Sequence, residues 1–138
     1  MSAARLYNGE VLGLATALAA FPLTDDLPLR GAARSTLCGS ALEIGLATDA
    51  AGRIVGAGLK VHACAIGQAA AAIFAQAAVG RDRAGLAQAE ARLREWLAQA
   101  DAPRPDWPGL EAIGPARAYP ARHAAILLAW QAALEALP

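Results

Sequence analysis

A turn signal between two alternating segments is the feature that most restricts the fold of this chain. Leu42, Ile44 and Leu46 alternate with small or charged residues, and a second alternating segment runs over 53–62. Residues 49–52 read Asp-Ala-Ala-Gly, and the glycine can adopt the left-handed backbone that such a turn requires. The pattern predicts an antiparallel β-hairpin. One face of its second strand should carry Val55, Ala57, Leu59 and Val61, and the other Ile54, Lys60 and His62.

Apolar residues recur at helical spacing on both sides of this hairpin. They predict helices over 9–20, 64–78, 81–100 and 122–137, with Pro22 and Gly80 as terminators. Residues 101–120 should be mostly loop with a short turn over 110–113, and one more short strand is expected before residue 38. We therefore expect an α+β fold in one domain over residues 1–138, with a small antiparallel sheet of about three strands and helices packed on one face.

The composition excludes several classes of function. The formal net charge is zero and there is no basic run, which argues against nucleic-acid binding and against a polybasic membrane contact. No apolar run reaches the roughly 18 residues of a transmembrane helix. The apolar stretch 11–21 follows Glu10 and lacks a convincing cleavage site, so it is not read as a signal peptide. Two cysteines make no disulfide framework, and we expect a cytoplasmic protein with reduced thiols.

The residues with the most chemical potential flank the predicted hairpin. Cys38 precedes it, and His62 and Cys64 follow its second strand. Because a hairpin returns on itself, the two cysteines should lie near each other. Cys64 should also begin a helix, where unpaired N–H groups favour an anionic thiolate. These residues alone are compatible with a two-cysteine metal or thiol site, but equally with inert buried thiols and a solvated histidine.

Five short segments resemble the NifU/IscU/SufU family of iron–sulfur cluster assembly scaffolds, and they come closest to the SufU type. Cys38-Gly39-Ser40 resembles the first cysteine motif, and residues 49–54 resemble the hairpin turn that follows it. Cys64-Ala65-Ile66-Gly67-Gln68-Ala69 is similar to the second cysteine motif. The other two matches are Pro120-Ala121-Arg122 with Leu128-Ala129-Trp130 for the last helix, and Leu6-Tyr7-Asn8 with Val11-Leu12 for the first.

This resemblance implies a SufE/NifU-like fold and a ligand set of three cysteines and one aspartate that holds a nascent [2Fe–2S] cluster or a zinc ion. It implies a cysteine desulfurase and cluster-accepting proteins as partners. Carried over by position, the two cysteines are Cys38 and Cys64, the aspartate position is Ser40, and the third cysteine position is Ala125. Two of the four implied ligands are therefore absent.

Two histidines could replace the missing ligands. His123 lies two residues before Ala125, and His62 lies two residues before Cys64. A set of Cys38, Cys64, His123 and His62 would suit zinc or a [2Fe–2S] cluster. A helix that already includes residue 122 would, however, place residues 123 and 125 on different faces.

Three functions remain open at the level of the sequence. The first is a non-enzymatic scaffold or accessory protein that holds a cluster, a metal ion or sulfur at Cys38 and Cys64. The second is a metal-free interaction or regulatory module that acts on a cysteine desulfurase. The third is an enzyme with Cys64 as nucleophile and His62 or His123 as base, for which no orienting Asp or Asn is evident.

Overall fold

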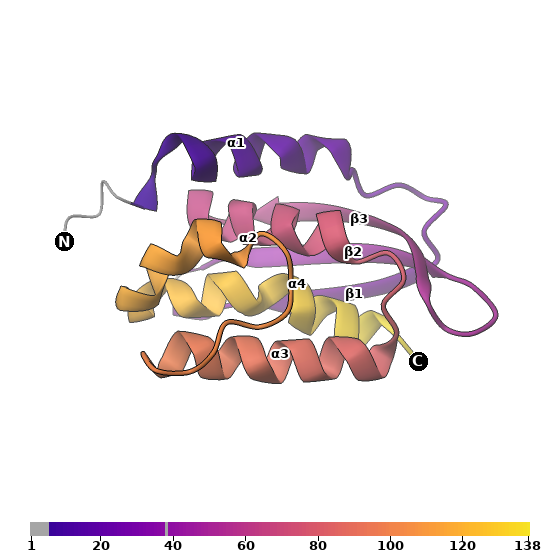
Figure 1. Cartoon of the computed structure of the whole chain (residues 1–138). Coiled ribbons are helices and arrows are strands. Elements are labelled where there is room, and N and C mark those ends of the chain that lie inside the picture. Colours follow the sequence, from indigo (N-terminus) through magenta and orange to yellow (C-terminus); the bar gives the residue numbers. More distant parts are fainter. Residues whose placement is uncertain (1–5, 38) are drawn as a thin grey trace.

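A three-stranded antiparallel sheet in the order β1-β2-β3 forms one layer of the molecule and lies behind the helices in Figure 1. The computed structural model describes residues 6–37 and 39–138. The strands are β1 (Leu29–Arg34), β2 (Ala41–Thr48) and β3 (Ile54–His62). The helices are α1 (Gly9–Ala17), α2 (Ala65–Ala77), α3 (Arg83–Ala98) and α4 (His123–Ala136), with the 3₁₀ segments η2 (Leu18–Ala20), η3 (Leu110–Ala118) and η4 (Pro120–Arg122). The predicted α+β class and sheet are confirmed.

The predicted hairpin is present. At the start of its second strand, however, the buried and exposed residues are exchanged relative to the prediction. Gly52 has a φ of 82°, and the Asp49 carboxylate accepts bonds from the backbone N–H groups of Ala51 and Arg53. A register shift between Ala47 and Thr48 places an extra residue in β3. Ile54 is therefore buried at 0% exposure and Val55 is 56% exposed, the opposite of the predicted faces.

The helices form one layer on the inner face of the sheet (Figure 1). Helices α2 and α4 pack on the strands, α1 lies against α2, and α3 lies against α4. The contact of α4 with β1 depends on a glycine, since a Cβ on Gly31 would lie 2.1 Å from the carbonyl oxygen of Ala132. The expected one-sided helical layer is thus confirmed, and Gly31 fixes how closely α4 approaches the sheet.

Part of the outer face is covered by the connection between α1 and β1. Phe21 and Pro22 run beside β3, where the Leu59 N–H donates to the Phe21 carbonyl, and the chain then crosses the sheet to β1 at its opposite edge. Leu27 occupies the space above Gly45 and Gly58, whose added Cβ atoms would each lie 2.8 Å from it. A side chain at Gly45 or Gly58 would collide with this crossing segment, which explains why both strands carry glycine there.

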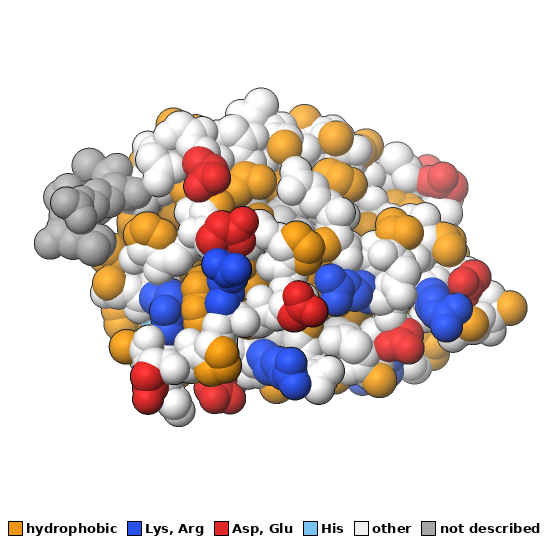
Figure 2. Space-filling model, viewed as in Figure 1, with side chains coloured by type: hydrophobic (Ala, Val, Ile, Leu, Met, Phe, Trp, Pro, Cys, Tyr) orange, Lys and Arg blue, Asp and Glu red, His pale blue; other side chains and the backbone are white. Residues whose placement is uncertain are grey.

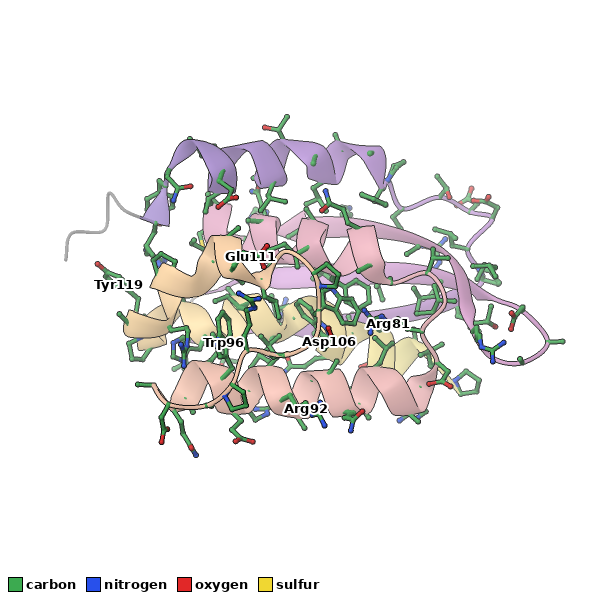
Figure 3. All side chains as sticks on the ribbon, viewed as in Figure 1. Arg81, Arg92, Trp96, Asp106, Glu111 and Tyr119 are labelled. Atoms are coloured by element: carbon green, nitrogen blue, oxygen red, sulfur yellow. The ribbon has the colours of Figure 1, made fainter. Side chains whose placement is uncertain are left out.

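An aromatic cluster joins α2, α4 and the segment before η3. Phe74, Trp107 and Trp130 have ring centroids 5.3–5.5 Å apart, and Trp107 Nε1 donates to the carbonyl of Ile73. Trp107 is 2% exposed, so it belongs to the core. Figure 3 shows Trp96 between α3 and η3, where the Arg117 guanidinium covers its ring at 4.7 Å. Segment 101–120 is thereby ordered, and η3 is longer than the predicted turn.

Charges are mixed on the face shown in Figure 2, where acidic and basic side chains alternate over the helices. No helix within the described residues is both long and apolar enough to cross a membrane.

Candidate functional site

The site lies where the hairpin ends meet the start of α4. A tight connection joins β1 to β2: the Ser35 N–H donates to the Ser40 carbonyl at 2.8 Å, and the Gly39 N–H donates to the Ser35 carbonyl at 3.0 Å. Gly39 has a φ of 72°, which suits glycine there. Ala41 lies opposite His62 in the register. Ser40 is therefore held next to the residues that lead from β3 into α2.

Cys64 is the N-cap residue of α2, as its place at a helix start predicts. Its ψ of 170° is extended, its side chain makes no capping bond, and its thiol is half-buried. The Gln68 side chain donates to the Ala63 carbonyl at 2.9 Å and so fixes the turn from strand to helix. Cys64 follows this turn directly and lines the pocket described below.

Ala125 enters the site from the first turn of α4, where it is 3% exposed. A Cβ on Gly67 would lie 3.3 Å from the Ala125 Cβ and 2.8 Å from the Ala63 Cβ. The absence of a side chain at Gly67 therefore lets α4 and α2 approach each other beside Cys64.

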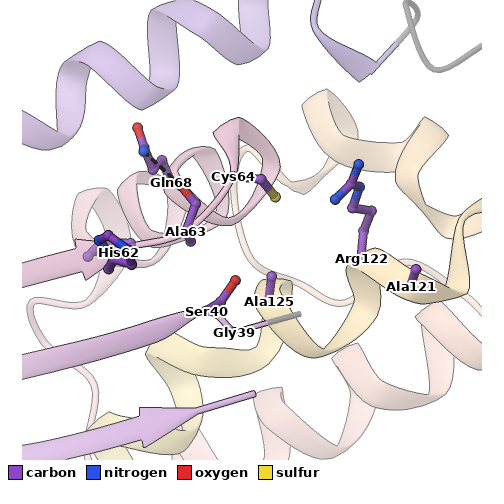
Figure 4. Close-up of a pocket in the computed structure, with 10 residues that line it drawn as sticks. Gly39, Ser40, His62, Ala63, Cys64, Gln68, Ala121, Arg122 and Ala125 are labelled. Atoms are coloured by element: carbon purple, nitrogen blue, oxygen red, sulfur yellow. Dashed lines mark hydrogen bonds between the residues drawn. The ribbon is translucent and has the colours of Figure 1, made fainter. Parts of the chain in front are cut away.

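A pocket of about 350 Å³ opens at this junction (Figure 4). Ser40, Cys64 and Ala125 all line it, so the structure brings together three of the four positions on which the implied ligands fall. The fourth, Cys38, lies outside the described residues, although its neighbour Gly39 lines the pocket. The complete lining is Gly39, Ser40, Val61, His62, Ala63, Cys64, Gln68, Ala121, Arg122 and Ala125.

The two histidines are placed differently. His62 is exposed and contributes to the pocket lining. His123 is not among the lining residues, and its Nε2 atom lies 3.0 Å from the carbonyl oxygen of Arg117. Since α4 begins at His123, residues 123 and 125 project in different directions. A ligand role for His123 would require its ring to leave the Arg117 carbonyl.

Few side chains at this pocket can bind a metal ion. Within residues 6–37 and 39–138, no three His, Cys, Asp or Glu side chains are close enough together to hold a metal ion. Ser40 is buried at 5% exposure, and Ala125 carries no donor. Any metal or cluster held at this pocket would therefore need Cys38, a rearranged histidine or a ligand from another molecule.

Two lining residues were not expected as parts of a site from the sequence. Gln68 lies one helical turn after Cys64, and this i,i+4 spacing was the signal that could have identified it. Arg122 also lines the pocket, opposite Cys64 (Figure 4).

Comparisons with known proteins were made by sequence and by structure. No family model and no curated protein sequence matches the chain. The fold matches the N-terminal part of a nitrogen-fixing NifU-like protein from Brucella abortus with a TM-score of 0.84 at 25% identity, covering 96% of this chain and 92% of that one. The chain resembles the NifU/IscU/SufU family.

A second NifU/SufU-like structure extends this resemblance. A candidate iron–sulfur cluster assembly scaffold protein for the SUF system, from Fervidobacterium islandicum, has a TM-score of 0.84 at 16% identity. The match covers 99% of this chain and all of that one. This neighbour is described as a candidate scaffold protein, the class that the sequence motifs resemble.

Proposed function

We propose that this chain is a scaffold or accessory protein of iron–sulfur cluster assembly, which holds its cargo in the pocket of Cys64. The observation that carries the proposal is that Ser40, Cys64 and Ala125 line one pocket although they lie far apart in the sequence. The similarity of the whole fold to a NifU-like protein and to a candidate SUF-system scaffold supports the same role.

The cargo is a [2Fe–2S] cluster, an iron or zinc ion, or sulfur carried on a thiol. Cys64 supplies one thiolate, and Cys38, next to Gly39 on the pocket wall, would supply the second. Zinc and [2Fe–2S] sites ordinarily have four protein ligands, so His62, His123 or a partner would complete the set. A site with so few ligands of its own suits transient carriage better than permanent storage.

The partners that fit this role are a cysteine desulfurase as sulfur source and proteins that accept the cluster. A cytoplasmic location suits it, since carriage requires reduced thiols.

Anaerobic reconstitution with ferrous iron and sulfide tests this proposal. The wild type should acquire iron and a visible cluster absorption, whereas Cys64→Ala and Cys38→Ala should lose both. His62→Ala and His123→Ala identify which histidine contributes. His123→Ala is informative because the folded structure assigns that ring to the Arg117 carbonyl. Equal iron content in the wild type and in both cysteine variants would contradict cargo carriage at this pocket.

A second candidate function is a metal-free module that acts on a cysteine desulfurase. Ser40 and Ala125 favour it, because two positions of the pocket carry no strong metal donor. In a pull-down, the double variant Cys38→Ala/Cys64→Ala should then retain a desulfurase as well as the wild type does. Loss of the desulfurase together with the thiols would favour cargo carriage instead.

A further inference from the structure

The pocket has an unusual charge balance for a cation site. Arg122 supplies a fixed positive charge, His62 is a further basic side chain, and no Asp or Glu is among its described lining residues. The Arg122 guanidinium forms no hydrogen bond or ion pair with any described residue. A cation whose own charge is not neutralised repels metal ions and attracts anions.

The surroundings of Arg122 strengthen this preference. Figure 4 shows the Cys64 sulfur and the Arg122 guanidinium facing each other across the pocket, with Ser40 and Ala125 below them. Arg122 is only partly exposed, so solvent screens its charge less than that of a surface arginine. Arginine N–H groups also match the geometry of oxyanions and bind them with short charge-assisted bonds.

We propose that this pocket binds small oxyanions, such as those of sulfur, non-covalently, with Arg122 as the residue that holds them. The inference rests on the proposed function, because it uses the same pocket. It refines that function for one of the proposed cargoes: sulfur that reaches the pocket arrives as part of an anion.

Calorimetric titration of the reduced protein with thiosulfate, and separately with sulfate, tests the inference. Both anions should bind saturably, and binding should weaken with added salt. Arg122→Gln should weaken binding about tenfold or more, since it removes charge-assisted hydrogen bonds. Arg34→Gln is the matched control: Arg34 is exposed at the end of β1 and does not line this pocket, so its loss should leave the affinity unchanged.

Cys64→Ser separates this inference from the proposed function. The serine variant should lose cluster or sulfur cargo but still bind both anions. If the wild type shows no saturable binding, or if Arg122→Gln binds as tightly as the wild type, the anion site is wrong even where cluster reconstitution succeeds. Folding of each variant is checked by its thermal unfolding, which Arg122→Gln should leave unchanged because the side chain has no described partner to lose.

Discussion

Ala125 lies in the first turn of α4, buried against Gly67 and facing the pocket of Cys64 and Ser40. A methyl group at that place offers no ligand, and the Ser40 hydroxyl is a weak one. The backbone positions, in contrast, still converge on one cavity. Three positions on which implied ligands fall therefore share one cavity, although only Cys64 among them carries a strong metal donor.

Introducing the two implied ligand side chains should therefore create a metal site. In Ser40→Asp/Ala125→Cys, we expect about one zinc ion per chain and a melting temperature that rises with added zinc, because metal binding stabilises the folded state. Elemental analysis and thermal unfolding measure both effects. Ser40→Asp/Ala124→Cys is the control, since residue 124 does not line the pocket. Equal zinc content in both double variants would contradict the convergence of positions 40, 64 and 125.

At the scale of elements, glycines determine how closely the layers approach. Gly31 in β1 lies directly beneath α4, where an added Cβ would meet the Ala132 carbonyl at 2.1 Å and the Ala136 amide nitrogen at 2.8 Å. Both are backbone atoms of a helix, so neither can move by a simple change of rotamer. The position of α4, and with it the position of Ala125, depends on this contact.

Gly31→Ala should therefore destabilise the protein by about 1–3 kcal/mol, the usual cost of overpacking. Urea unfolding followed by circular dichroism measures it. Gly13→Ala in α1 is the matched control, since nothing lies within 4 Å of its added Cβ, and alanine should stabilise that helix by up to about 1 kcal/mol. A neutral Gly31→Ala would mean that α4 does not pack on β1 as described.

The elements that could be predicted from the sequence are those whose pattern is local. The hairpin follows from alternation around the 49–52 turn, and the helices follow from apolar periodicity. The reversal at Ile54 and Val55 could not be predicted, because a bulge depends on which partner residue each strand residue meets. The crossing of residues 22–28 over the sheet has no periodicity of its own. For the pocket, the hairpin pattern predicts only that its two ends lie close together. The entry of Ala125 and the contact of His123 with the Arg117 carbonyl depend on how α4 packs.

At the scale of the whole molecule, the four helices and the sheet share one core. Residues from α1, β2, β3, α2, α3, η3 and α4 belong to a single buried cluster, against which Leu29 and Ala33 of β1 pack. Its aromatic centre joins Phe74, Trp107 and Trp130, which come from widely separated segments. Loss of any one layer would expose this centre.

Unfolding should therefore be a single cooperative transition, as is usual for a small domain with one core. Tryptophan fluorescence reports on the aromatic cluster and far-ultraviolet circular dichroism on the helices, and the two urea midpoints should coincide. Separate midpoints would show that a part of the chain unfolds independently, and would contradict a single domain.

The crossing segment also has a consequence for the order of events during folding. Leu27 packs over Gly45 in β2 and Gly58 in β3, so the surface that receives it exists only after these two strands have paired. The β2–β3 hairpin closes over a short turn, so its formation costs little chain entropy. Packing residues 22–28 on the sheet costs more, because this segment connects the two opposite edges of the sheet. We therefore expect residues 22–28 to pack on the outer face only after β2 and β3 have paired.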